Sequence, residues 1–219
     1  MHLTVDAGLA VLELRRPEKR NAVTAEMWEA IVDLLAEAAA LQHVRVLAIQ
    51  GSGGVFCAGA DLSAVKTSTG EVSIQYRELA VRALSAIASF PAPSVAVIDG
   101  ACVGGGCSIA LACDLRFATP ESFFRVPAVR HGIVYDEASM DRLIQLLGPS
   151  RAAHFMCTAA TLSGDQAHHA GLVDECTDRL DIPLEQFVAE VAQGDWHTVA
   201  RTRALLRKLA DSPAAVSAY

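Results

Sequence analysis

The chain has 219 residues, a net charge of −7 at neutral pH, 52% hydrophobic residues and 20% charged residues. The acidic balance argues against nonspecific binding to nucleic acid or to a membrane surface, because both depend on an excess of Lys and Arg. No stretch approaches the roughly 18 apolar residues of a membrane span, and the first residues lack the basic and apolar regions of a signal peptide, so we expect one core domain in the cytoplasm.

Strand and helix patterns alternate along most of the chain. Apolar runs predict strands at residues 3–5, 9–14, 44–49, 94–98, 115–118 and 122–126, with a short strand near 172–173. Helical spacing predicts helices from Thr24, as the cap, to about 41, then at 76–88, 105–112, 137–147 and 198–209. Strands connected by crossover helices predict an α/β fold with a mainly parallel sheet. We divide the chain into a core, 1–177, and a C-terminal helical segment, 178–219.

Two glycine turns follow predicted strands. Gly104, Gly105 and Gly106 lie between a strand pattern and a helix pattern, and a second turn is the segment Phe56–Cys–Ala–Gly–Ala–Asp–Leu62. Glycines at a helix N-terminus let a ligand reach backbone N–H groups, where the helix dipole also favours negative charge. Either turn alone is compatible with a simple tight connection. Together they predict two backbone donors that converge on one oxygen.

The motifs resemble one family in their order along the chain. Besides the two glycine turns, the matching segments are Arg16–Pro–Glu–Lys–Arg–Asn–Ala22, Ala112–Cys–Asp–Leu–Arg–Phe–Ala118 and Leu162–Ser–Gly–Asp–Gln–Ala–His–His–Ala–Gly–Leu–Val–Asp174. The chain, over about residues 3–177, resembles the enoyl-CoA hydratase/isomerase family, also called the crotonase superfamily. The resemblance implies a spiral of ββα turns followed by helices that pack on neighbouring subunits, and hence a homo-oligomer, a trimer or a dimer of trimers.

The resemblance also implies chemistry on a coenzyme A thioester, carried as the substrate with no separate cofactor. The N–H groups of Ala60 and Gly105 would hold the thioester carbonyl oxygen and stabilise an enolate. The basic run of residues 15–20 precedes positions that contact the CoA phosphates. The implied CoA contacts are Arg16, Arg20, Ala22, Ala58 and Asp61. The alternative for the basic run is a solvated turn.

Two departures from the family pattern bear on the activity. The positions of the two glutamates that activate water in hydratases are Ser108 and Ala128. Neither side chain can act as a carboxylate base, so efficient hydration by the usual mechanism is not expected.

A carboxylate does occur at another family position. Asp136 matches the place of the catalytic aspartate of dienoyl-CoA isomerases and of the nucleophile of chlorobenzoyl-CoA dehalogenases, although neither subtype is matched whole. We therefore predict an isomerase-like enzyme that uses Asp136. Two alternatives stay open: Asp136 as a helix N-cap only, and a non-catalytic binder of long acyl-CoA in lipid metabolism. A hydrolase with Ser108 and His131 is weaker, because the Gly-x-Ser-x-Gly elbow is absent.

The six cysteines show no Cys-x-x-Cys pair, and the seven histidines show no His-Glu-x-x-His spacing. We interpret the cysteines as small core side chains in a reducing compartment and predict no metal site.

Overall fold

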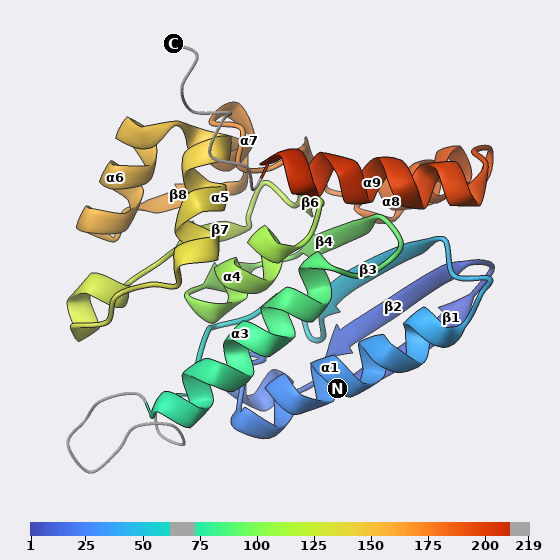
Figure 1. The fold of residues 1–219 in the computed structure, drawn as a ribbon. Helices are drawn as coiled ribbons and strands as arrows, with labels where there is room; N and C mark the ends of the chain where they lie inside the picture. Colours follow the sequence, from blue (N-terminus) through green and yellow to red (C-terminus); the bar gives the residue numbers. More distant parts are fainter. Residues whose placement is uncertain (62–72, 211–219) are drawn as a thin grey trace.

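The computed structural model describes residues 1–61 and 73–210, and Figure 1 shows a twisted sheet with helices packed around it. The described strands are β1 (His2–Asp6), β2 (Leu9–Leu14), β3 (Val46–Gly51), β4 (Ser94–Ile98), β5 (Ala101–Val103), β6 (Leu115–Ala118), β7 (Phe123–Arg125), β8 (Thr161–Ser163) and β9 (Glu175–Cys176). The described α-helices are α1 (Ala25–Ala40), α3 (Ile74–Ala88), α4 (Gly105–Ala112), α5 (Glu137–Leu147), α6 (Pro149–Thr158), α7 (Gly164–His169), α8 (Asp181–Ala192) and α9 (Trp196–Ala210).

The main sheet has the order β1-β2-β3-β4-β6-β9. The hairpin of β1 and β2 is antiparallel, and every later pair in this sheet is parallel. A second sheet has the order β5-β7-β8. The α/β class and the mainly parallel sheet predicted from the sequence are therefore confirmed.

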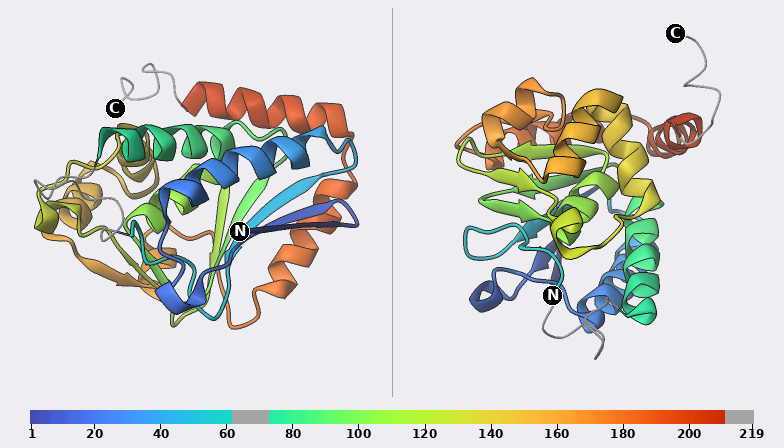
Figure 2. Two further views of the ribbon diagram at one scale, coloured as in Figure 1. Left: turned by 90° about the horizontal axis from the view of Figure 1, so that it is seen from below. Right: turned by 90° about the vertical axis from the view of Figure 1, so that its left-hand side faces the viewer.

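The two faces of the main sheet are covered by different helices. Helices α1 and α3 pack side by side on one face (Figure 2), and the side chain of Thr24 caps α1 by accepting a hydrogen bond from the N–H of Met27. On the opposite face, Phe187 of α8 packs edge-on against Phe117 of β6, with ring centroids 6.4 Å apart. Most of the apolar core lies on the α1 and α3 side.

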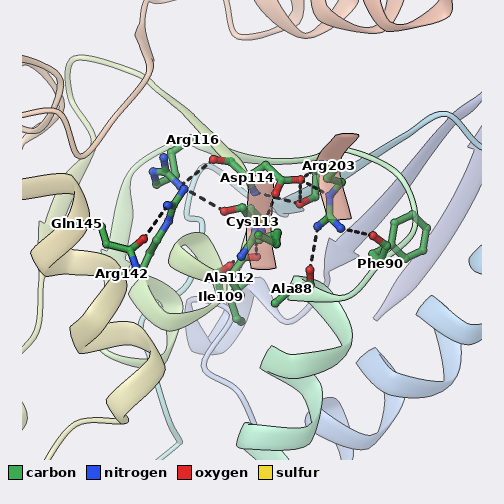
Figure 3. A network of polar contacts seen from close by, with 12 residues as sticks. Ala88, Phe90, Ile109, Ala112, Cys113, Asp114, Arg116, Arg142, Gln145 and Arg203 are labelled. Carbon is green, nitrogen blue, oxygen red and sulfur yellow. Dashed lines mark hydrogen bonds and ion pairs between the residues drawn. The ribbon is translucent and has the colours of Figure 1, made fainter. Parts of the chain in front are cut away.

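Helix α9 is attached to the core through Asp114, which lies just before β6 (Figure 3). The Asp114 carboxylate accepts hydrogen bonds from Arg203 Nε at 2.6 Å and Arg207 Nε at 2.8 Å, and it also binds the N–H and hydroxyl of Ser94. Arg203 donates further to the carbonyls of Phe90 and Ala88. One carboxylate thus connects the last described helix to two segments of the core.

Some predicted elements differ from the structure. The strand expected near residues 172–173 is wrong, because the N–H groups of Leu172 and Val173 both donate to the carbonyl of Ala167 and so end α7. The strand forms two residues later, as β9. The three-residue strands β5 and β8 were not predicted, because so short a segment carries too few residues for an alternating pattern.

The cysteines also differ in part from the prediction. Four of them are buried, but Cys157 is exposed and Cys176 is half-buried, so the interpretation of all six as core side chains is wrong for these two. Cys157 lies near the end of α6, a surface helix that buries only two of its side chains.

No helix within residues 1–61 and 73–210 is both long enough and apolar enough to cross a bilayer.

Candidate functional site

The two glycine turns lie directly against each other. The N–H of Cys57 donates to the carbonyl of Ala101 at 2.8 Å, and the N–H of Val103 donates to the carbonyl of Cys57 at 2.9 Å. A methyl group built on Gly106 would lie 2.6 Å from the Cys57 carbonyl oxygen, closer than any real side chain comes. Gly106 therefore lets helix α4 start directly against the glycine turn at Cys57.

This packing brings Ala60 and Gly105 together. The neighbours of Ala60 pair with Val23, since Val23 N–H donates to Gly59 at 2.8 Å and Asp61 N–H donates to Val23 at 3.0 Å. Successive N–H groups in an extended segment point to opposite sides, so the Ala60 N–H faces away from Val23. Gly105 is the first residue of α4, where an N–H has no acceptor within the helix.

Neither N–H has a hydrogen-bond partner among residues 1–61 and 73–210. The two residues are close, because a Cβ built on Gly105 would lie 3.7 Å from the Ala60 nitrogen. Two unpaired backbone donors therefore lie beside each other at the positive end of a helix dipole, an arrangement that suits an oxygen with negative charge.

The predicted CoA-contact residues gather beside this pair of donors. Arg16 forms an ion pair with Asp61 at 2.7 Å and donates to the carbonyl of Ala22, and the N–H of Ala58 donates to the carbonyl of Arg20. The structure therefore places these five residues in one region.

The basic run is partly neutralised by carboxylates of the chain. Arg15 pairs with Glu13 at 2.7 Å, and Arg16 pairs with Asp61 and, at 3.8 Å, with Glu18. Lys19 and Arg20 are exposed and have no carboxylate partner in the described part of the chain. Among the four predicted phosphate-facing cations, Lys19 and Arg20 are therefore the two whose charge is not neutralised by a carboxylate of the described residues.

Asn21 connects the basic turn to the loop of residues 52–55, which leads into the glycine turn at Cys57. The fully buried side chain accepts from the N–H of Arg16 at 2.8 Å and donates to the carbonyls of Ser52 and Val55 at 2.9 and 2.6 Å. Asn21 also has a φ of 55°, a left-handed conformation that Asn tolerates better than most residues. In the sequence, Asn21 is noticeable only because it lies in the segment Arg16–Ala22 that matches the family. Its role in connecting two segments is seen only in the folded structure.

Helices α4 and α5 meet in a polar cluster made by Ser108, Tyr135 and Asp136. The Ser108 hydroxyl oxygen lies 2.7 Å from the Tyr135 hydroxyl and 2.9 Å from Asp136 Oδ2. Asp136 Oδ1 accepts from the N–H of Ser139 at 2.8 Å and caps α5. Asp136 is therefore an N-cap, as one alternative predicted, and its second oxygen is directed to Ser108.

Other predicted residues lie apart from this cluster. Ala128 is buried at the start of the short helix η2 (Ala128–His131), whereas His131 at its end is exposed. His131 makes no hydrogen bond to Ser108 in the described part of the chain, and the Ser108 hydroxyl is directed to Tyr135 and Asp136. The geometry gives no support to a Ser–His hydrolase pair.

Two cavities lie elsewhere on the molecule. One of about 470 Å³ lies between the end of α1 and Trp196 at the start of α9, and one of about 230 Å³ lies beside α6 and includes His154 and Ala170. Neither is lined by Ala60, Gly105 or Asp136. The two backbone donors therefore lie outside both of these cavities.

Comparison with known proteins points to one family. Residues 4–216 match the family model described as enoyl-CoA hydratase/isomerase. The chain is 35% identical to human "Enoyl-CoA hydratase domain-containing protein 2, mitochondrial" over 214 residues, which cover 96% of this chain and 69% of the relative. It is 29% identical over 193 residues to the rat mitochondrial "Delta(3,5)-Delta(2,4)-dienoyl-CoA isomerase", covering 83% of this chain and 59% of that protein.

A solved structure extends the match to the fold. An enoyl-CoA hydratase/isomerase family protein from Hyphomonas neptunium superposes with a TM-score of 0.90 at 32% identity, over 99% of this chain and 86% of that one. The spiral fold expected from the motifs is therefore confirmed.

Proposed function

Because the chain belongs to the enoyl-CoA hydratase/isomerase family, we propose that it binds acyl-CoA thioesters and stabilises their enolates through the N–H groups of Ala60 and Gly105. The observation that carries the proposal is the pair of adjacent backbone donors without partners in the described part of the chain. Loss of a proton beside the thioester carbonyl places negative charge on the carbonyl oxygen. Fixed donors at that oxygen stabilise the enolate more than the ground state.

Replacement of Gly105 by Pro tests this proposal. Pro removes the N–H but suits the first position of a helix, and the nearest atoms to a new Cβ lie 3.6–3.8 Å away, at ordinary contact distances. We expect exchange of the proton beside the thioester carbonyl to fall by roughly 10²–10³-fold, with a nearly unchanged melting temperature. Proton exchange is followed by NMR in D₂O with a saturated acyl-CoA.

Gly105→Ala is the matched control, because it adds the same Cβ but keeps the N–H. This variant should retain most of the proton exchange. In a separate measurement, calorimetry should show that the wild type binds the thioester more tightly than free CoA. Equal exchange in Gly105→Pro and Gly105→Ala would contradict the role of this donor.

We further propose an isomerase-like reaction in which the Asp136 carboxylate removes a proton from one carbon of the acyl chain and returns it to another. Two features support this assignment: Asp136 is connected through Ser108 to the residues around Gly104, and a relative of the chain is named as a dienoyl-CoA isomerase. The proton that Asp136 removes from one carbon is the proton that it returns to the other, so the reaction requires no further reactant.

The variant Asp136→Asn separates catalysis from capping. Asn keeps the size of the side chain and caps helices nearly as well, but it cannot accept a proton from carbon. We expect double-bond migration to be abolished, with acyl-CoA affinity within severalfold of the wild type. Ultraviolet spectroscopy of dienoyl-CoA follows the reaction. Unchanged turnover would contradict the assignment and make Glu137 the next residue to test.

The second candidate is a binder of acyl-CoA that does not catalyse. The observation that favours it is that both oxygens of Asp136 already accept hydrogen bonds, from Ser139 and Ser108. In that case Asp136→Asn is silent, and the wild type shows neither double-bond migration nor proton exchange while still preferring the thioester over free CoA.

We also propose that Arg20, with Lys19, contacts the CoA phosphates, while Arg16, Ala22, Ala58 and Asp61 shape the adjoining surface. This role is supported by the exposure of the Lys19 and Arg20 side chains, neither of which pairs with a carboxylate of residues 1–61 or 73–210. A homo-oligomer, a trimer or a dimer of trimers, is proposed from the family and is measured by analytical ultracentrifugation.

A further inference from the structure

Tyr135 binds the back of the peptide unit that carries one of the two proposed donors. Its hydroxyl donates to the carbonyl oxygen of Gly104 at 2.7 Å. That carbonyl belongs to the same peptide unit as the N–H of Gly105. We propose that Tyr135 is a positioning residue that orients and polarises the Gly104–Gly105 peptide, so that the Gly105 N–H is a stronger donor to a thioester oxygen. The inference rests on the proposed function.

The direction of this hydrogen bond follows from its chemistry. A peptide carbonyl can only accept, so the proton between the two atoms belongs to the Tyr135 phenol. Burial raises the pKa of this phenol well above its ordinary value, and the neighbouring Cys107 and Asp136 act in the same direction although the bond from Ser108 opposes them. Tyr135 therefore keeps its proton, and remains a donor, throughout the physiological pH range.

The conformation of Gly104 makes a restraint on this peptide necessary. Its φ of 51° and ψ of −117° lie in a region of backbone conformation that residues other than glycine hardly adopt. The N–H of Gly104 donates to Arg125 at 2.9 Å, and its carbonyl accepts from Ser108 N–H at 3.2 Å as well as from Tyr135. Gly104 is thus bound through its own N–H and through its carbonyl, so the Gly104–Gly105 peptide is held at its oxygen, whereas its N–H, that of Gly105, has no partner in the described part of the chain.

The hydrogen bond from Tyr135 to the Gly104 carbonyl also has an electronic effect besides its geometric one. Withdrawal of electron density at a peptide oxygen makes the N–H of that peptide more positive, and such bonds strengthen one another in chains. In this series of hydrogen bonds Tyr135 is the first donor, and the thioester oxygen of the substrate would be the last acceptor. On the other side, the phenol oxygen lies 2.7 Å from the Ser108 hydroxyl, which in turn lies 2.9 Å from Asp136 Oδ2.

Tyr76 offers a matched control within the same protein. Its buried hydroxyl also donates to a backbone carbonyl, that of Val23 at 3.0 Å. The N–H of that peptide belongs to Thr24, the cap of α1, and the same carbonyl also accepts from the Asp61 N–H at 3.0 Å, a bond that Tyr76→Phe retains. Tyr135→Phe and Tyr76→Phe therefore delete the same group from the same kind of bond, but only the first acts on the peptide unit that carries a proposed donor.

The test uses the full-length protein with butyryl-CoA labelled with ¹³C at the thioester carbonyl. Infrared spectroscopy reports the carbonyl stretch, which moves to lower frequency when the oxygen accepts strong hydrogen bonds. In the wild type we expect a clear downward shift from the value in water. Tyr135→Phe should lose a substantial part of it and bind the thioester roughly two- to tenfold more weakly, with unchanged affinity for free CoA. Tyr76→Phe should keep the shift.

The outcomes separate this inference from the proposed function. A wild type without a carbonyl shift and without preference for the thioester removes both. A shifted wild type with an equally shifted Tyr135→Phe, or equal losses in Tyr135→Phe and Tyr76→Phe, overturns only the role of Tyr135. If Tyr135→Phe does not fold, 3-fluorotyrosine at position 135 decides: its more acidic phenol is a stronger donor to the Gly104 carbonyl and must increase the shift, and an unchanged shift contradicts the inference.

Discussion

We expect this protein to hydrate crotonyl-CoA at least about a thousandfold more slowly than a competent hydratase, because general acid and base catalysis contribute roughly 10²–10⁴-fold. The family resemblance assigns the positions of the two water-activating glutamates of hydratases to Ser108 and Ala128. Ala128 is buried and has no polar side-chain atom, and the Ser108 hydroxyl is already bound to Tyr135 and Asp136. No carboxylate therefore occupies either position.

The assay follows the loss of ultraviolet absorbance of the conjugated thioester, with a competent hydratase measured in parallel. Asp136→Asn is included because Asp136 is the carboxylate hydrogen-bonded to Ser108. Turnover like that of an ordinary hydratase in the wild type would contradict the placement of the missing acids. If such turnover disappeared in Asp136→Asn, Asp136 would be the water-activating group.

The second large effect is expected for Asp114→Ala, which should lower the free energy of unfolding by about 3–5 kcal/mol, the usual effect of leaving a buried charge without its partner. Arg203 is 8% exposed and Arg207 is half-buried, and both donate to this carboxylate. The variant also removes the acceptor for Ser94. Chemical denaturation measures the loss, and hydrogen exchange should show that α9 opens first.

Two controls support this interpretation. The ion pair between Arg179 and Asp181 has a similar length, 2.6 Å, but both side chains are exposed, so Asp181→Ala should leave stability unchanged within error. In the double variant Asp114→Ala, Arg203→Met, the charge of Arg203 is removed together with its partner, although Arg207 stays, and the total loss should be smaller than the sum of the single losses. Additive losses would indicate that the pair does not stabilise the attachment of α9.

Acid should weaken the same contact. Burial raises the pKa of Asp114, but the charges of Arg203 and Arg207 outweigh burial and hold the pKa below its ordinary value. The stability that Asp114 contributes is therefore complete above the unfolded-state pKa of about 3.9 and is lost as the pH falls further through the folded-state pKa. Asp114→Ala should lack this part of the acid dependence.

Local patterns in the sequence determined most of the elements and the chemistry of the site. Thr24 before a run with helical spacing marks α1, buried apolar runs mark β3 and β4, and the glycine turns mark two backbone donors. These signals depend on neighbours within one turn or one strand, so the sequence contains them completely. The absence of carboxylates at residues 108 and 128 is likewise read from the sequence, but its meaning for hydration rests on the resemblance to the family.

Only the tertiary structure decided which groups meet. Arg203 reaches Asp114 across 89 positions of the chain, and Tyr135 reaches Gly104 across 31. The short strands β5 and β8 form only because β7 lies between them. Such contacts depend on how packed layers place distant segments side by side, and no local periodicity encodes them. For that reason the sequence predicted a backbone donor at Gly105, whereas the hydrogen bond from Tyr135 to the carbonyl of the same peptide is found only in the folded chain.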